Sequence, residues 1–286
     1  MYRHLKTQEE IDREYNPRLS VSDVDSTVQG WKDRSAATRA GNGNRLRRGY
    51  GATLAEYLDI FPAHAPDAPV HIFIHGGYWR AFSAEDFSFI ADSGMARGAA
   101  TVIVNYELCP KVRIAEIVRQ VRAAVAWVWH NAAQFGADRD RIAVSGHSAG
   151  GHLAGRLIAT PWERDYGLPP DTIKGACAIS GLFDLEPLRW SWLQPAVQFT
   201  ADDILSESPI RHLPITPTPV LAAVGGLESA EFHRQTEAYA EALVHAGSPA
   251  RTLDVPGRNH FTILDDLAAP DGPLWLAVEE MLNRGR

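Results

Sequence analysis

The chain has 286 residues, of which 45% are hydrophobic and 22% are charged, and its formal net charge is −7. These values are ordinary for a globular protein, and the length fits a single α/β domain. The negative charge is spread along the chain without a long run of either sign, which argues against a nucleic-acid partner. No apolar stretch approaches the ~18 residues of a membrane-spanning helix, so we expect no membrane partner either.

The N-terminal composition and the cysteine count bear on the compartment. The first thirty residues are polar and charged, which does not fit a secretory signal. The two cysteines, Cys109 and Cys177, cannot form a disulfide framework, and neither has an evident metal partner nearby in the sequence. We therefore expect a cytoplasmic protein with packed thiols and no metal. The sequence leaves the oligomeric state open, a homodimer included.

Strands alternate with helical segments from residue 70 onward, which predicts a mostly parallel sheet with helices on both faces. The predicted strands are 70–74, 101–104, 142–145, 177–180, 219–224 and 251–255. The predicted helices are 83–97, which Ser83 and Asp86 would open as a capping box, 113–135, the apolar stretch after Ser148, 232–246, and a last helix from about residue 272.

Two segments do not fit this alternation, although we treat residues 1–286 as one domain. They are the N-terminal segment 1–50 and an insertion at 185–219, and we expect them to form a small cap above the carboxyl ends of the strands. The insertion carries Trp190 and Trp192. We expect these side chains to contact a flat aromatic substrate; the alternative is that they pack the insertion onto the core.

The strand at 142–145 leads into Gly146-His-Ser148-Ala-Gly150 and then into the apolar helical stretch. This is the pattern of a nucleophile elbow, in which a serine sits on a sharp turn between a strand and a helix. Glycine two positions away on either side removes side chains that would collide with the neighbouring strand and helix. The sequence therefore predicts that Ser148 is a nucleophile.

The strand at 70–74 is followed at once by His75-Gly76-Gly77-Tyr78-Trp79. Hydrolases with a nucleophile elbow bind the oxyanion with the N–H after the nucleophile and with N–H groups of an earlier glycine-rich loop. We expect Ala149, Gly76 and Gly77 to supply these groups. The alternative is an ordinary strand-end turn with a core histidine.

Two bulky residues, Tyr78 and Trp79, follow the glycines of this loop. We hypothesise that they contact substrate and narrow the acyl side of the site, so that a formyl group fits and longer acyl chains do not. The alternative for Trp79 is that it anchors the loop in the core.

The remaining catalytic residues should follow in the order acid, then histidine. His260, after the strand at 251–255, is the only histidine beyond residue 245 and is the expected base. The acid is expected after the strand at 219–224, where Glu228 is our choice. Asp184 is the other contender, and we expect Glu231 to favour the start of the next helix instead.

Several motifs together resemble one family. They are His-Gly-Gly-Tyr-Trp at 75–79, Gly-His-Ser-Ala-Gly-Gly-His at 146–152, Ser-Gly-Leu-Phe-Asp-Leu-Glu-Pro-Leu at 180–188, Glu-Ser-Ala-Glu-Phe-His-Arg-Gln at 228–235 and Asn-His-Phe at 259–261. The chain resembles kynurenine formamidases (arylformamidases), which are α/β-hydrolases related to the hormone-sensitive-lipase-like esterases. The resemblance runs from about Tyr15 to Leu267.

The resemblance implies the α/β-hydrolase fold, with Ser148 as nucleophile, His260 as base and the acid at Glu228, where the family pattern has aspartate. It also implies hydrolysis of an N-formyl arylamine, typically N-formylkynurenine, without a cofactor. A carboxylesterase or amidase acting on another small aromatic compound is the first alternative. A non-catalytic binding protein on a hydrolase scaffold is the second.

Overall fold

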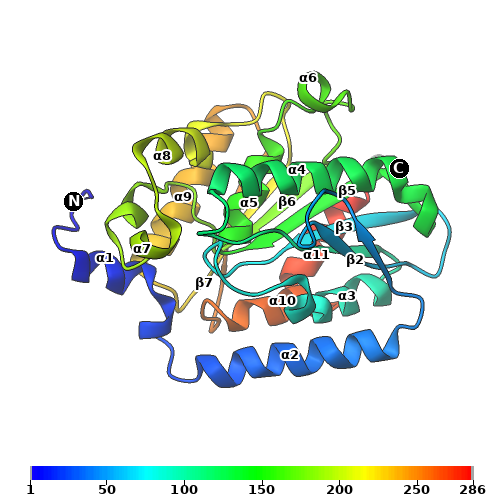
Figure 1. Cartoon of the computed structure of the whole chain (residues 1–286), viewed down its shortest axis with the longest axis horizontal. Coiled ribbons are helices and arrows are strands. Elements are labelled where there is room, and N and C mark those ends of the chain that lie inside the picture. The colour runs from blue at the N-terminus through cyan, green and yellow to red at the C-terminus, as the bar shows by residue number, and fades with distance from the viewer. Residues whose placement is uncertain (1, 285–286) are drawn as a thin grey trace.

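The computed structural model of the chain describes residues 2–284, whose centre is an eight-stranded sheet (Figure 1). The sheet order is β1-β2-β4-β3-β5-β6-β7-β8. Strands β1 and β2 pair antiparallel at one edge and β2 pairs antiparallel with β4, whereas the other neighbours are parallel. The strands are β1 (Leu46–Gly49), β2 (Tyr57–Phe61), β3 (Ala68–Ile74), β4 (Ala100–Val104), β5 (Ala137–His147), β6 (Gly175–Ile179), β7 (Val220–Gly225) and β8 (Ala250–Val255).

Helices connect most of the parallel strands. The α-helices are α1 (Gln8–Tyr15), α2 (Val24–Gly41), α3 (Ala91–Ala96), α4 (Ile114–Asn131), α5 (Ala149–Ile158), α6 (Trp162–Tyr166), α7 (Gln194–Val197), α8 (Ala201–Glu207), α9 (Ala230–His245), α10 (Asp265–Ala268) and α11 (Pro273–Leu282). Short 3₁₀ helices occur at η1 (Pro17–Leu19), η2 (Ala84–Ile90), η3 (Ala132–Phe135), η4 (Glu186–Trp190), η5 (Pro209–Arg211) and η6 (Thr262–Leu264).

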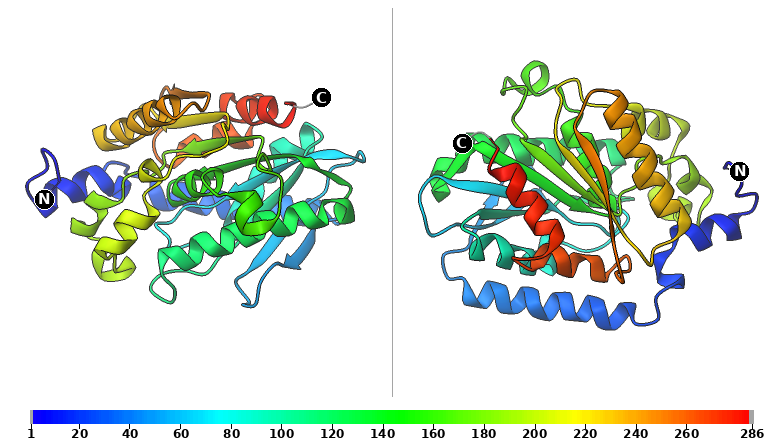
Figure 2. Two further views of the ribbon diagram at one scale, coloured as in Figure 1. Left: turned by 90° about the horizontal axis from the view of Figure 1, so that it is seen from above. Right: turned by 180° about the vertical axis from the view of Figure 1, so that it is seen from behind.

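The sheet is buried on both faces, as the near-continuous apolar strands predict. Successive residues of β3 illustrate this, because Ile72 and Phe73 are both fully buried but belong to different apolar layers. One layer includes α4, α5 and α9, and the other includes α3, α10 and α11. The view from behind in Figure 2 shows α11 lying across the sheet and α2 running along the outside of the molecule.

The predicted mostly parallel sheet is confirmed, and it also contains two strands that were not predicted, β1 and β2. Both strands contain charged residues, which weakens their sequence pattern. Asp59 in β2 is fully buried and accepts hydrogen bonds from Arg47 at 2.7 and 2.8 Å and from Arg45 at 3.2 Å. A buried ion pair across an antiparallel edge does not produce the apolar alternation from which strands are predicted.

One predicted helix also differs in form. Ser83 and Asp86 make the expected capping box, in which the Ser83 N–H donates to Asp86 Oδ2 at 2.9 Å. The segment that follows is 3₁₀ over Ala84–Ile90 and becomes α-helical only at Ala91–Ala96. The predicted helix over 113–135 is likewise α4 followed by the 3₁₀ turn η3, and it ends at Gly136 with φ of 70°.

Only part of the N-terminal segment 1–50 lies with the insertion 185–219, as the predicted cap requires. Helices α1, α7 and α8 lie together at one end of the molecule (Figure 1), and the N–H of Trp192 donates to Asp12 Oδ1 at 2.7 Å, which joins the insertion to α1. By contrast, α2 packs along η2, and β1 belongs to the sheet.

None of the helices in residues 2–284 has the length and apolar character that a membrane-spanning helix needs.

Candidate active site

Ser148 lies between β5 and α5, on the sharp turn that the glycine pattern predicts. Its backbone has φ of 59° and ψ of −118°, which is a strained conformation for a residue other than glycine. A Cβ at Gly146 would lie 2.0 Å from the Gly150 carbonyl oxygen, so only glycine permits this close crossing of strand and helix. The Ser148 N–H donates to the Ile179 carbonyl at 2.8 Å, which fixes the turn against β6.

Glu228 and His260 lie on the loops after β7 and β8 and make direct contact. Glu228 Oε2 lies 2.5 Å from His260 Nδ1, and the exposed fractions of the two side chains are only 1% and 4%. The other carboxylate oxygen accepts from the Ser180 hydroxyl at 2.5 Å and from the Gly225 N–H at 2.8 Å. With Nδ1 held by the carboxylate, Nε2 of His260 is the ring nitrogen that can exchange a proton with substrate or serine.

Asp184, the other contender for the acid, has different partners. It accepts a hydrogen bond from the Tyr2 hydroxyl at 2.7 Å and belongs to the contacts of the N-terminal segment. Glu231 has a structural role and does not hydrogen-bond to His260. It accepts a hydrogen bond from the hydroxyl of Tyr15 at 2.6 Å and forms an ion pair with Arg234 at 2.7 Å. Glu228 is therefore the carboxylate that the fold places on His260.

His147, which the sequence analysis did not single out, ties the elbow to the histidine loop. Its Nε2 donates to the backbone carbonyl of His260 at 2.7 Å, and the two rings are 4.7 Å apart between centroids. Burial, together with the neighbouring His260, holds the pKa of His147 well below its usual range. A neutral ring with its proton on Nε2 fits this hydrogen bond. Its position directly before the serine was the only signal in the sequence.

The glycine-rich loop after β3 lies against the elbow. A Cβ at Gly76 would be 2.7 Å from the His147 carbonyl oxygen and 3.0 Å from Ser148 Cβ, so glycine allows the loop backbone to approach the serine. Ala149 is the first residue of α5, where N–H groups have no partner within the helix. This arrangement brings Gly76, Gly77 and Ala149 together around Ser148.

His75 is a core residue that supports this loop. Its Nδ1 lies 2.8 Å from the Gly76 carbonyl oxygen, and its ring stacks on Phe87 and Tyr106 with centroid distances of 5.6 and 4.3 Å. Burial lowers the pKa of His75 to about 4. The core-histidine alternative thus describes His75 itself, while the adjoining glycines still lie against the elbow.

Trp79 anchors the glycine-rich loop in the core and does not line the cavity at Ser148. Its side chain is fully buried, and its Nε1–H donates to His152 Nδ1 at 3.2 Å. His152 Nε2 in turn lies 2.8 Å from the Glu207 carbonyl oxygen. The prediction that Trp79 and Trp190 contact substrate is wrong, because neither lines the cavity at Ser148, and Trp190 is 41% exposed.

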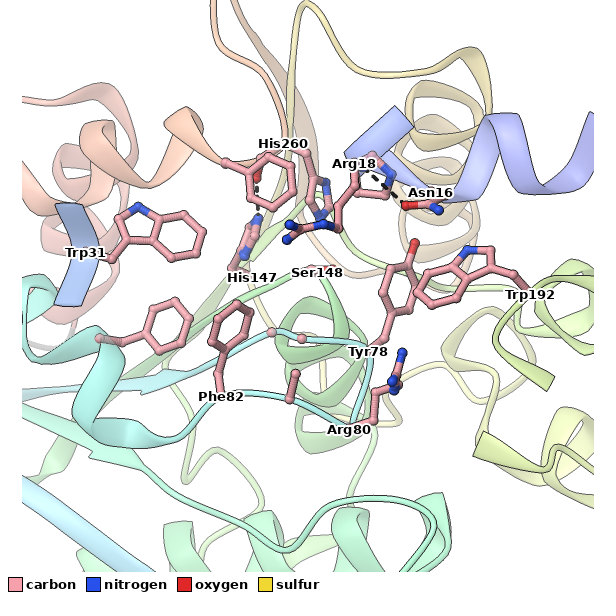
Figure 3. Close-up of a pocket in the computed structure, with 16 residues that line it drawn as sticks. Asn16, Arg18, Trp31, Tyr78, Arg80, Phe82, His147, Ser148, Trp192 and His260 are labelled. Atoms are coloured by element: carbon pink, nitrogen blue, oxygen red, sulfur yellow. Dashed lines mark hydrogen bonds between the residues drawn. The ribbon is translucent and has the colours of Figure 1, made fainter. Parts of the chain in front are cut away.

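Ser148 and His260 open onto a cavity of about 230 Å³ (Figure 3). Of the residues predicted to contact substrate, Tyr78 and Trp192 line it. Six of the residues in its wall are aromatic, and the wall also includes Pro17 and Arg18 of η1 and Trp31 of α2, which were not predicted from the sequence. The aromatic residues of the wall are Trp31, Tyr78, Phe82, Phe87, Trp192 and Phe261.

Within residues 2–284 there is no group of three or more His, Cys, Asp or Glu side chains placed to hold a metal ion. Cys109 and Cys177 are buried and free, and burial raises the pKa values of their thiols to about 11 and about 12. Thiols of this kind are poor nucleophiles at neutral pH, which leaves Ser148 as the nucleophilic side chain of the cavity.

Comparison with known proteins decides the family. The BD-FAE family model matches residues 58–165. A kynurenine formamidase of Danio rerio is 31% identical to this chain, and the alignment covers 97% of each protein. The chain belongs to the kynurenine formamidase family.

Solved structures show the fold that this chain shares. A candidate thioesterase from Silicibacter sp. TM1040 is 29% identical, covers 94% of this chain and 99% of its own, and superposes with a TM-score of 0.85. An esterase of Pyrobaculum calidifontis, at 19% identity and 96% coverage of both chains, has a TM-score of 0.72 and shows the fold. The protein is therefore a hydrolase with the α/β-hydrolase fold, and not a non-catalytic binding protein.

Proposed function

We propose that this enzyme hydrolyses small N-formyl arylamines, and N-formyl-L-kynurenine in particular, to the free arylamine and formate. The observation that carries the proposal is the small cavity of about 230 Å³, walled by aromatic rings, into which Ser148 and His260 open. Flat aromatic compounds bind well between such rings. The similarity to a kynurenine formamidase over 97% of both chains supports the same substrate class.

In this proposal Ser148 Oγ attacks the formyl carbon while His260 Nε2 takes the serine proton. Glu228 keeps the His260 ring in the required tautomer and stabilises the imidazolium. The N–H groups of Gly76, Gly77 and Ala149 stabilise the oxyanion, and loss of one such donor in comparable enzymes costs roughly 10²–10³ in turnover.

Collapse of the tetrahedral intermediate breaks the C–N bond, and protonated His260 gives its proton to the leaving arylamine nitrogen. An amide needs this proton far more than an ester does, because an amine anion is a very poor leaving group. Water then attacks the formyl ester of Ser148 by the same route, which releases formate and restores the free serine. No step requires a cofactor.

The test is kcat/KM on N-formyl-L-kynurenine beside p-nitrophenyl acetate, with Ser148→Ala as the blank for background hydrolysis. We expect the formamide to be preferred by about two orders of magnitude, which corresponds to roughly 3 kcal/mol of transition-state discrimination. If the ester is hydrolysed and the formamide is not, the formamidase proposal fails, and the enzyme is an esterase on the same scaffold.

The second candidate is a general esterase or amidase for small aromatic compounds. The observation that favours it is the close structural match, at 29% identity, to a protein described as a candidate thioesterase. Broad activity on short p-nitrophenyl esters, with no preference for formanilides, would support this candidate.

A further inference from the structure

The cavity around Ser148 has an apolar end made of four aromatic side chains. Trp31 is the centre of this group, and its ring centroid lies 5.4 to 6.2 Å from those of its three neighbours. We call this group the aromatic end of the cavity: Trp31, Phe82, Phe87 and Phe261. It offers ring faces and edges but no charged group, so it suits the ring of an aryl substrate.

The opposite end carries a positive charge. Trp192 packs edge-on against Tyr78 with 5.7 Å between ring centroids, and the Arg80 guanidinium carbon lies 5.7 Å from the centre of the Trp192 ring. We call Tyr78, Arg80 and Trp192 the cationic end. Figure 3 shows Trp31 and Trp192 on opposite sides of Ser148, with Arg80 on the Trp192 side.

The charge of Arg80 is not compensated within the cavity. Among the residues that the structure describes, 2–284, no carboxylate pairs with Arg80, and no Asp or Glu lines the cavity. The second arginine on the wall, Arg18, is paired with Asp25. Arg80 is thus an exposed guanidinium at the edge of an aromatic wall, without a carboxylate partner, and such a group is available to bind an anion.

The backbone of Arg80 belongs to the loop that approaches Ser148. Its backbone N–H donates to the Gly77 carbonyl at 3.1 Å, so it belongs to the same turn as the glycines proposed to bind the oxyanion. The ring of Trp192 supports its side chain. A substrate group bound to Arg80 would therefore help to position the formyl carbon at Ser148.

We infer that Arg80 binds the carboxylate at the end of the ortho side chain of N-formyl-L-kynurenine, and thereby favours formanilides that carry such a carboxylate. This inference rests on the proposed function. With the aryl ring in the aromatic end, an ortho substituent starts next to the reacting amide and can pass Ser148 toward Arg80. A para substituent points away from the amide and cannot do so.

The lining of the cavity also predicts how an amino group on that side chain affects catalysis. Because no Asp or Glu of residues 2–284 lines the cavity, an ammonium group finds no counter-charge there. Removal of the α-amino group of N-formyl-L-kynurenine should therefore change kcat/KM less than threefold. Removal of its negative charge should be the costly change.

The experiment uses two matched formanilides that lack the amino group. One is 4-(2-formamidophenyl)-4-oxobutanoate, and the other is its carboxamide, which has the same shape and no charge. For the wild-type enzyme we expect kcat/KM, followed by arylamine release, to favour the carboxylate by at least about tenfold, or 1.4 kcal/mol. In Arg80→Gln this preference should disappear through slower turnover of the carboxylate, with the carboxamide rate unchanged.

Three control variants isolate the role of Arg80. Arg48→Gln removes an exposed arginine outside the cavity, whose side chain bonds the Arg47 carbonyl, and should keep the preference. Arg18→Gln should also keep it, because Arg18 already has Asp25 as its partner. Arg80→Lys should retain part of the preference for the carboxylate, since the positive charge remains while the bidentate geometry of the guanidinium is lost.

Each outcome separates this inference from the proposed function. Hydrolysis of neither formanilide by the wild type would overturn the proposed function. Equal hydrolysis of both would overturn only the role of Arg80. An equal loss of kcat/KM on both compounds in Arg80→Gln would show that Arg80 has a structural role in the loop. Loss of the preference in Arg18→Gln would assign carboxylate binding to Arg18. Either result overturns the inference.

If Arg80→Gln does not fold, the wild-type preference for the carboxylate must still fall as ionic strength approaches about 1 M. A preference that does not change with ionic strength contradicts the inference.

Discussion

Nε2 of His147 donates a hydrogen bond of 2.7 Å to the backbone carbonyl of His260. The residue before the proposed nucleophile thus holds the backbone of the proposed base, across a separation of 113 residues in the chain. Glu228 orients the ring of His260, whereas His147 fixes the loop that carries it. These two contacts act on different parts of the same residue.

Replacing His147 with alanine should lower kcat about tenfold with little change in KM. The His260 carbonyl would lose its donor, and an unsatisfied buried group of this kind costs about 1–3 kcal/mol, enough to loosen the loop. His147→Gln, whose amide can donate from a similar position, should recover most of the rate. Steady-state kinetics on the formamide test this, and an unchanged kcat in His147→Ala would contradict it.

Replacing Glu228 with glutamine should lower kcat by roughly 10⁴, the size of effect seen when the acid of a serine triad is neutralised. The amide cannot stabilise the imidazolium, and it can hold the ring in the wrong tautomer. Asp184→Asn is the matched control, because Asp184 bonds Tyr2 and not His260. If both variants lose activity equally, or only Asp184→Asn does, Glu228 is not the acid.

Tyr78 should limit the length of the acyl group. It lines the cavity beside Ser148, and its hydroxyl donates to the Tyr15 carbonyl, which holds the ring in place. For the wild type, rates on p-nitrophenyl esters should fall steadily from formyl to octanoyl. Tyr78→Ala should flatten this profile, whereas Tyr78→Phe keeps the ring and should preserve it. Undiminished wild-type activity up to octanoyl would disprove the role of Tyr78.

His71 should make the free energy of unfolding depend on pH. Its ring is fully buried, with Nε2 2.6 Å from the Ser145 hydroxyl, and burial lowers its pKa to about 3. An unfolded histidine binds a proton near pH 6.5, so the unfolded state gains protons that the folded state does not. The contribution is present in full above pH 6.5 and falls, by about 1.4 kcal/mol per pH unit, as the pH drops toward 3.

Urea unfolding of the wild type and of His71→Gln at pH 7, 6 and 5 measures this contribution. Other buried histidines, such as His75 and His152, titrate in both proteins and cancel in the difference. The stability advantage of the wild type over the variant should shrink as the pH is lowered from 6.5. A difference that stays constant with pH would contradict the assignment.

The sequence by itself determined the parts of the site that depend on local backbone geometry. Gly146 is required by the close crossing of strand and helix at Ser148, because its Cβ would meet the carbonyl oxygen of Gly150, which lies only four residues further along the chain. The alternation of strands and helices, and the position of His260 late in the chain, follow from patterns that neighbouring residues produce. These features can be predicted from the sequence because they act over short distances.

Only the tertiary structure decided which distant side chains meet. Glu228 and Asp184 follow different strands, and their partners, His260 and Tyr2, depend on how the loops and the N-terminal segment pack over the sheet. The same packing buried Trp79 on His152, left Trp190 outside the cavity and placed Arg80 on the ring of Trp192. Aromatic and charged residues are equally compatible with a core, a surface or a site, so their roles are fixed by packing and not by their position in the sequence.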